Sequence, residues 1–174
     1  MLLEDYQRLA SRTSTQKTEY QSALLAIAGL GLCGESAELH EAFEVPDATK
    51  QQLELGDVFW YVAEIATICH LDLTEGQQVS DNASTIHLMA RAGHLADHIK
   101  KHVGHGHPLS TEYVSEALGG LVNLLTQLAN NYGYDRTDIL EQNIAKLRLR
   151  YPNGFSTENS IQRVDKVQDA HIQS

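Results

Sequence analysis

The chain has 174 residues, 42% of them hydrophobic and 21% charged, and its formal net charge at pH 7 is -10. Such a chain is long enough for one folded domain with a substantial core. Its acidic balance argues against nucleic-acid polymers and anionic membranes as partners, and the early charges in MLLEDYQRLA are unlike a signal peptide. We therefore expect a cytoplasmic protein, in which Cys33 and Cys69 are reduced core thiols.

Helical periodicity dominates the sequence, and alternating runs of β-branched residues are few, so we predict an all-α fold. Asp47 is suited to cap the second long helix, and Gly104 and Gly133 are suited to end later ones. The polar segment 156–174 is interpreted as a C-terminal tail that follows a single domain over 1–155. The expected helices lie over residues 4–10, 19–43, 47–70, 83–103, 111–132 and 138–151.

An internal repeat emerges when the two halves of the chain are compared. GESAELHE aligns with GHLADHIK, and ELGDVFWYVAEIATICHLDLT aligns with ALGGLVNLLTQLANNYGYDRT, which has five identical positions. We interpret this as a duplicated helical hairpin, with repeat 1 over 19–74, repeat 2 over 83–137 and a basic closing helix over 138–151. Repeat 2 is degenerate, because the acids of repeat 1 align with His94, Asp97, Ala117 and Gly120.

Two pairs of acids lie at matching positions of the first predicted hairpin. Glu35 and Glu38 lie one turn apart at the edge of an apolar helix face, and Glu54 and Asp57 lie at the equivalent edge of the next helix. The short loop between these helices makes them antiparallel neighbours, which brings four carboxylates to one groove. Four half-buried anions would repel one another without a cation, and Mg²⁺ accepts carboxylate oxygens. The pattern therefore predicts a divalent-metal site.

Surface charge is the alternative interpretation of such acids. Acids three residues apart are common on solvated helix faces, but two such pairs at the apolar margins of adjacent helices favour a functional site. Three further acids are interpreted as surface charge: Glu41, Glu44 and Glu64. The histidine-rich loop has no cysteine nearby and is interpreted as exposed rather than as a zinc site; it contains His102, His105 and His107.

The acids form an E-x-x-E motif, Glu35 to Glu38, followed after fifteen residues by an E-x-x-D motif, Glu54 to Asp57. They lie in the stretches GLCGESAEL and ELGDVFWYV, and the chain also contains DYQRLASRT near its start and NIAKLRLRYPNGF at 143–155. With these four blocks the sequence resembles the MazG-like all-α nucleoside triphosphate pyrophosphohydrolases, a family that includes the dimeric dUTPases.

The resemblance implies a MazG-like helical bundle with enzymatic activity. It implies Mg²⁺-dependent hydrolysis of a nucleoside or deoxynucleoside triphosphate to the monophosphate and pyrophosphate, with Mn²⁺ as an alternative ion. The four acids would bind the metal, and Glu35 or Glu38 would orient the attacking water. It also implies a homodimer or homotetramer.

Residues outside the acid motifs would contact the substrate. Lys146 and Arg150, one turn apart, would neutralise the triphosphate, and Asn143 on the same face would contact sugar or base. A basic helix end that complements the helix dipole is the alternative explanation for the two cations. Trp60 and Tyr61 would stack on the base, although core packing accounts equally well for aromatic residues there.

The basic block NIAKLRLRYPNGF at 143–155, which closes the family's usual unit, departs from the family pattern in its position. In compact members it directly follows the first hairpin, whereas here HLDLTEGQQVSDNAS takes that place and the basic block follows repeat 2. The site would then be composite, as in the dimeric dUTPases. The rival hypothesis is a non-catalytic helical bundle that binds a nucleotide or a protein, with a structural metal on its acids. A third is a scaffold without metal dependence.

Overall fold

The computed structural model describes residues 1–14, 20–76 and 83–163. These residues form seven α-helices, one short 3-10 helix and no β-strand, which confirms the predicted all-α fold. The helices are α1 (Leu3–Ala10), η1 (Ser11–Thr13), α2 (Gln21–Phe43), α3 (Ala48–Ile68), α4 (Thr85–His105), α5 (Thr111–Asn131), α6 (Arg136–Arg150) and α7 (Thr157–Gln162).

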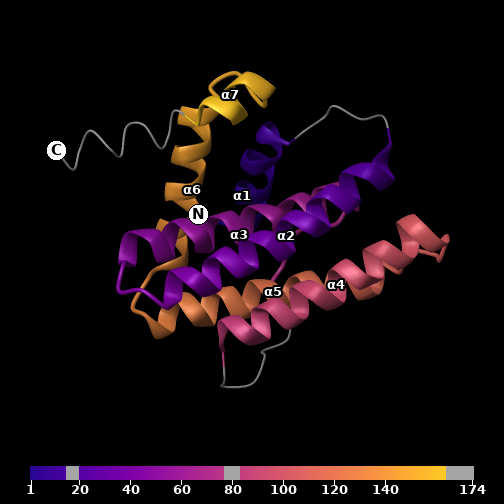
Figure 1. The fold of residues 1–174 in the computed structure, drawn as a ribbon, viewed down its shortest axis with the longest axis horizontal. Helices are drawn as coiled ribbons and strands as arrows, with labels where there is room; N and C mark the ends of the chain where they lie inside the picture. Colours follow the sequence, from indigo (N-terminus) through magenta and orange to yellow (C-terminus); the bar gives the residue numbers. More distant parts are fainter. Residues whose placement is uncertain (15–19, 77–82, 164–174) are drawn as a thin grey trace.

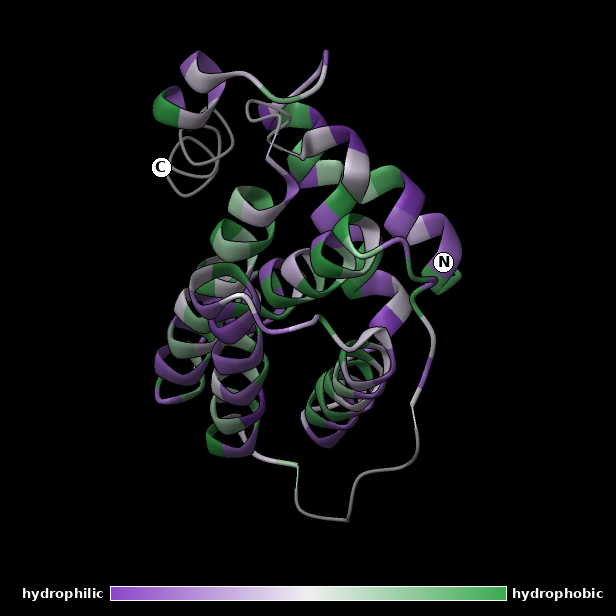
Figure 2. Cartoon of the chain, turned by 90° about the vertical axis from the view of Figure 1, so that its right-hand side faces the viewer, coloured by the Kyte–Doolittle hydropathy of each residue, from purple (hydrophilic) through white to green (hydrophobic). Residues whose placement is uncertain are grey.

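Four long helices, α2 to α5, lie roughly along one direction, and α1 and α6 stand across them (Figure 1). Helix α2 packs most extensively against α3 and α4, and α3 also packs against α5 and α6. The core between these helices contains fully buried side chains such as Leu32, Phe59, Leu95 and Leu121. Hydrophobic and hydrophilic stretches alternate along the helices in Figure 2, as expected for elements that each bury one side.

Capping residues set several helix ends as the sequence predicts. The Asp47 side chain accepts a hydrogen bond from the Lys50 backbone N–H and begins α3. Gly133 has a φ of 77° just after α5, a left-handed conformation that glycine adopts readily. The prediction that Gly104 ends the fourth helix was wrong. Helix α4 continues to His105, and Gly106, with a φ of 72°, is the residue that takes the left-handed conformation.

The C-terminal region differs from the predicted tail over 156–174. Residues Thr157–Gln162 form helix α7, and the Ser156 side chain caps it by accepting from the Asn159 backbone N–H. The cap supplies a local hydrogen bond that a polar composition alone does not reveal. The rest of the predicted tail, residues 164–174, lies outside the described residues.

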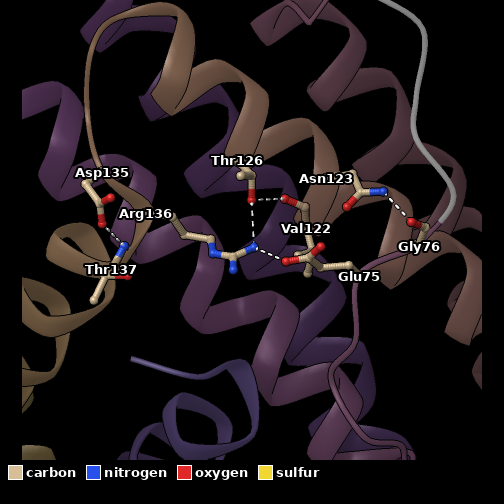
Figure 3. Close-up of polar contacts among 8 residues, drawn as sticks. All are labelled: Glu75, Gly76, Val122, Asn123, Thr126, Asp135, Arg136 and Thr137. Carbon is tan, nitrogen blue, oxygen red and sulfur yellow. Dashed lines mark hydrogen bonds and ion pairs between the residues drawn. The ribbon is translucent and has the colours of Figure 1, made fainter.

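The segment after α3 is fixed against α5 and α6 by polar contacts shown in Figure 3. Asn123 donates to the Gly76 carbonyl at 2.5 Å, and Arg136 pairs with Glu75 at 2.6 Å. A Cβ atom at Gly119 would lie 2.7 Å from the Gly76 Cα, so this approach requires glycine. The first contact holds the segment after α3 against α5, and the ion pair holds it against the start of α6.

Helix α2 is long and apolar. Among the described residues it is the one helix long and apolar enough to cross a membrane, a property that core helices of soluble proteins share. Much of it is covered by α3 and α4, while Ile27 and Leu30 remain exposed.

Candidate functional site

The hairpin of α2 and α3 brings the two predicted acid motifs together. Its corner is tied by the buried Gln51, whose amide donates to the Val45 carbonyl at 2.8 Å and to the Ala42 carbonyl at 3.4 Å. Tyr134 in turn donates from its hydroxyl to the Gln51 side chain at 2.5 Å. The two helices are therefore held in one register, which fixes how their acidic faces meet.

Three acidic side chains from this hairpin converge. Glu35 and Glu38 on α2 and Glu54 on α3 place carboxylate oxygens within 4.8 Å of one another. In the part of the chain that the structure describes, this is the one group of three or more acidic, histidine or cysteine side chains that could share an ion. The three histidines of the predicted loop form no such group. The loop interpretation was wrong for His102 and His105, which lie in the last turn of α4, and His102 contacts the His107 carbonyl at 2.8 Å.

Two of the three triad carboxyl groups have raised pKa values. Burial, followed by the charges of Asp57, Glu38 and Glu54, raises the pKa of Glu35 to about 7. The pKa of Glu54 is also raised, mainly by burial and then by Asp57 and Glu38. A raised carboxyl pKa means that the anionic form is disfavoured in the folded protein. A divalent cation would reverse this, because it attracts the charged carboxylates.

Asp57, the fourth predicted acid, points to other partners. It forms an ion pair with Lys146 of α6 and accepts a hydrogen bond from the Asn143 amide at 3.0 Å. The Tyr6 hydroxyl donates to the Asn143 oxygen at 2.8 Å and to the Gly56 carbonyl at 3.3 Å. This chain of contacts joins α1, α3 and α6, so Asp57 lies beside the triad with its charge already compensated.

The triad and Asp57 line a cleft of about 670 Å³, hereafter the acidic cleft. Lys146 and Arg150, the two predicted cations, also line it, as do Lys50 and Arg163. Asn143 does not, because it is 2% exposed and lies behind Asp57. The structure therefore brings acids of α2 and α3 to one cleft with basic residues of α3, α6 and the segment after α7. Asn143 is buried and contacts Asp57 instead of lining the cleft.

Trp60 and Tyr61 also line the acidic cleft. Their rings meet edge to face at 4.8 Å between centroids, and the Trp60 indole N–H donates to the Thr13 hydroxyl at 2.9 Å. The Tyr61 ring lies over Gly31, where an added Cβ would come within 2.1 Å of it. Both aromatic side chains are half-buried, so each combines packing contacts with a surface that lines the cleft.

Sequence reasoning missed three contributors to this region. Lys50 lies one turn before Glu54 on the same helix face, a spacing that was readable. Tyr6 lies in the DYQ stretch, but its role depends on Asn143, which is far away in the chain. Arg163 follows α7 within the supposed polar tail, so no periodic pattern marked it.

The interpretation of Glu64 as surface charge was wrong, whereas Glu41 and Glu44 are exposed as expected. Glu64 is 5% exposed and accepts a hydrogen bond from the Ser14 hydroxyl. Its pKa is raised by burial. The partner lies 50 residues away in the chain, which local spacing does not reveal.

The prediction of core thiols holds for Cys69 but not for Cys33. Both are free, with Cys69 buried and Cys33 half-buried. Burial raises the pKa of the Cys69 thiol to about 11.

Comparison of the chain with protein-family models, with curated proteins and with solved structures finds no match in any of the three. The assignment of the acidic cleft as a candidate site therefore depends on its geometry alone. Three carboxylates converge there, a fourth is paired with Lys146, and basic side chains line the same cleft.

Proposed function

We propose that the protein is a nucleoside triphosphate pyrophosphohydrolase, which cleaves a nucleoside or deoxynucleoside triphosphate to the monophosphate and pyrophosphate. The observation that carries this proposal is the convergence of Glu35, Glu38 and Glu54 within a cleft that basic side chains also line. The resemblance of the acid motifs and the closing block to MazG-like enzymes supports the same reaction.

The residues of the triad fit a hard divalent cation. Carboxylate oxygens from two helices are the donors that Mg²⁺ and Mn²⁺ accept, and an open cleft leaves room for water and phosphate oxygens in the remaining positions. Glu35, Glu38 and Glu54 would hold the ion, and Asp57 would join them if Lys146 moved to a phosphate. When bound, such an ion neutralises phosphate charge and lowers the pKa of a coordinated water.

The chain's own residues would handle the proton and the leaving group. Glu35 or Glu38 accepts a proton from the attacking water, whose oxygen forms a new bond to phosphorus. The phosphoanhydride bond between the α- and β-phosphates breaks, and its electrons go to the departing phosphate oxygen. Lys50, Arg150 and Arg163 line the cleft, where they would offset the negative charge of the triphosphate.

Two features would position the reacting groups. The contacts of Tyr6 with Asn143 and of Asn143 with Asp57 hold the Asp57 carboxylate in one orientation. Trp60 and Tyr61 line the same cleft and would offer a ring face or edge to the base. Stacking on a base is compatible with any nucleobase, so the cleft defines the class of substrate and not the base.

The test is a panel of all common nucleoside and deoxynucleoside triphosphates with Mg²⁺, assayed separately for pyrophosphate and for inorganic phosphate. We expect pyrophosphate from at least one substrate, and we expect Glu38→Gln to abolish its release. Glu41→Gln is the matched control, because Glu41 is exposed on the same helix and does not line the cleft. Undiminished pyrophosphate release by Glu38→Gln would reject the assignment, and nucleotide-induced thermal stabilisation without turnover would favour a non-catalytic binding bundle.

A further inference from the structure

A second cleft, of about 510 Å³, lies between α4 and α5. Its volume is within the range usual for small-ligand sites. His87, Arg91 and His94 of α4 face Tyr113 and Glu116 of α5 across it. Neither the acid motifs nor the proposed hydrolysis involves these residues.

The second cleft occupies the place in repeat 2 that the acidic cleft occupies in repeat 1. The sequence alignment of the repeats carries Glu54 to position 117, an offset of 63 residues. With this offset, buried positions of α3 fall on buried positions of α5, for example Leu55 on Leu118 and Val62 on Leu125. The two helices therefore present equivalent faces to the core and to the surface.

The lining residues correspond as well. On α3, Lys50, Leu53 and Glu54 line the acidic cleft. The same offset carries them to three residues that line the second cleft, Tyr113, Glu116 and Ala117. The alignment of the preceding helices pairs Glu35 with His94, and each of these lines its own cleft.

The second cleft lacks the carboxylates that line the acidic cleft from the aligned positions 35, 54 and 57. Repeat 2 has His94 in place of Glu35, Ala117 in place of Glu54 and Gly120 in place of Asp57. A Cβ at Gly120 would lie 2.9 Å from the Arg91 guanidinium, so the cation occupies the space that an aspartate side chain would enter. None of the ion pairs recorded within the described ranges involves Arg91.

We propose that the second cleft binds the phosphate group of a nucleoside monophosphate directly, without a metal ion. A guanidinium presents paired N–H donors that match phosphate oxygens, and an imidazole ring also carries an N–H donor. Arg91, His87 and His94 supply these groups from one helix. Tyr113 offers an aromatic ring beside them, and Glu116 is an acceptor for a sugar hydroxyl or a base N–H.

The experiment measures binding to the full-length chain by isothermal titration calorimetry in EDTA, so that no divalent ion contributes. The probes are AMP, UMP, pyrophosphate and inorganic phosphate. We expect a monophosphate to bind and Arg91→Ala to weaken it roughly tenfold, the effect of losing one charge-assisted hydrogen-bonding group. Arg148→Ala is the matched control, because Arg148 is exposed and lines neither cleft.

A second variant tests the same contact without removing the arginine. Gly120→Asp introduces a carboxylate beside the flexible end of Arg91, so we expect it to pair with the guanidinium and to weaken nucleotide binding. Circular dichroism of each variant verifies that it is folded. Unchanged affinity in folded Arg91→Ala, or no binding of any probe in EDTA, would overturn the proposal.

Two further comparisons identify the cleft that binds the nucleotide and distinguish a nucleotide from free phosphate as the ligand. Loss of AMP or UMP binding in Lys146→Ala, with retention in Arg91→Ala, would place the ligand in the acidic cleft and overturn the assignment. Equal affinity for inorganic phosphate would overturn the assignment to a nucleotide. Glu38→Gln should leave binding in EDTA unchanged, so a failure of the proposed hydrolysis is distinguishable from a failure of this site.

Discussion

Replacing Glu35 with glutamine should stabilise the metal-free protein at alkaline pH. Its carboxyl group is half-buried beside Glu38, Glu54 and Asp57, and its pKa rises from 4.5 to about 7. A carboxyl whose pKa is higher in the folded protein favours folding fully below pH 4.5, and this contribution is lost as the pH rises through about 7. At pH 8 the Glu35 carboxylate is therefore charged in the folded protein and is repelled by the neighbouring acids. Glutamine removes this charge and the repulsion.

The size of the effect follows from the pKa. The rise from 4.5 to about 7 corresponds to roughly 3 kcal/mol, because each tenfold change in acidity is about 1.4 kcal/mol. Since Glu35 is only partly buried, solvent screening reduces the expected gain to about 1–2 kcal/mol. Most of that gain should disappear at pH 5, where the folded protein carries the protonated form.

Urea unfolding followed by circular dichroism, in EDTA at pH 5 and pH 8, measures this difference. Glu41→Gln is the control, because Glu41 is exposed on the same helix, and its substitution should change the free energy of unfolding little at either pH. A loss of stability in Glu35→Gln at pH 8, or an equal change at both pH values, would refute the electrostatic reasoning.

Two other substitutions test the packing around the acidic cleft. Tyr6→Phe removes the hydroxyl that donates to the Asn143 side-chain oxygen. Because that buried oxygen loses its donor, the free energy of unfolding measured in urea should fall by about 1–3 kcal/mol. The substitution should also lower the rate of pyrophosphate release more than it changes KM. Gly31→Ala forces the Tyr61 ring to move and should cost about 1–3 kcal/mol. Gly34→Ala on the same helix, where nothing lies within 4 Å of the added Cβ, should not destabilise the protein, and similar losses in both alanine variants would contradict this explanation.

The helices were largely predictable because their signals are local. Asp47 caps α3 through the N–H of a residue three positions later, and Gly133 ends α5 through its own backbone conformation. The end of α4 was misplaced because the stretch GHG offers two glycines. Only the backbone shows that Gly106, and not Gly104, adopts the left-handed conformation.

The convergence of the acidic triad was predictable because its three members share one hairpin. Helix periodicity places Glu35, Glu38 and Glu54 on facing edges, and the structure brings them together. Asp57 shares that face, but its ion pair with Lys146 spans 89 residues of the chain. Such contacts depend on how α6 crosses α3, which no local spacing encodes.

The same reason explains the outcome for Asn143. Its position on the face of Lys146 suggested contact with a ligand, yet the crossing of α1 buries it between Tyr6 and Asp57. Hydrogen bonds between polar residues far apart in the sequence therefore position Asp57 at the acidic cleft.

Binding of Mn²⁺ to the full-length protein, followed by the electron paramagnetic resonance signal of the free ion, tests most directly whether the triad holds a divalent cation. We predict that the wild-type chain depletes the free-ion signal at neutral pH, that Glu38→Gln and Glu54→Gln each weaken this binding at least tenfold, and that the exposed control Glu41→Gln does not. Equal Mn²⁺ affinity in all four proteins, or no depletion by the wild type, would contradict the account.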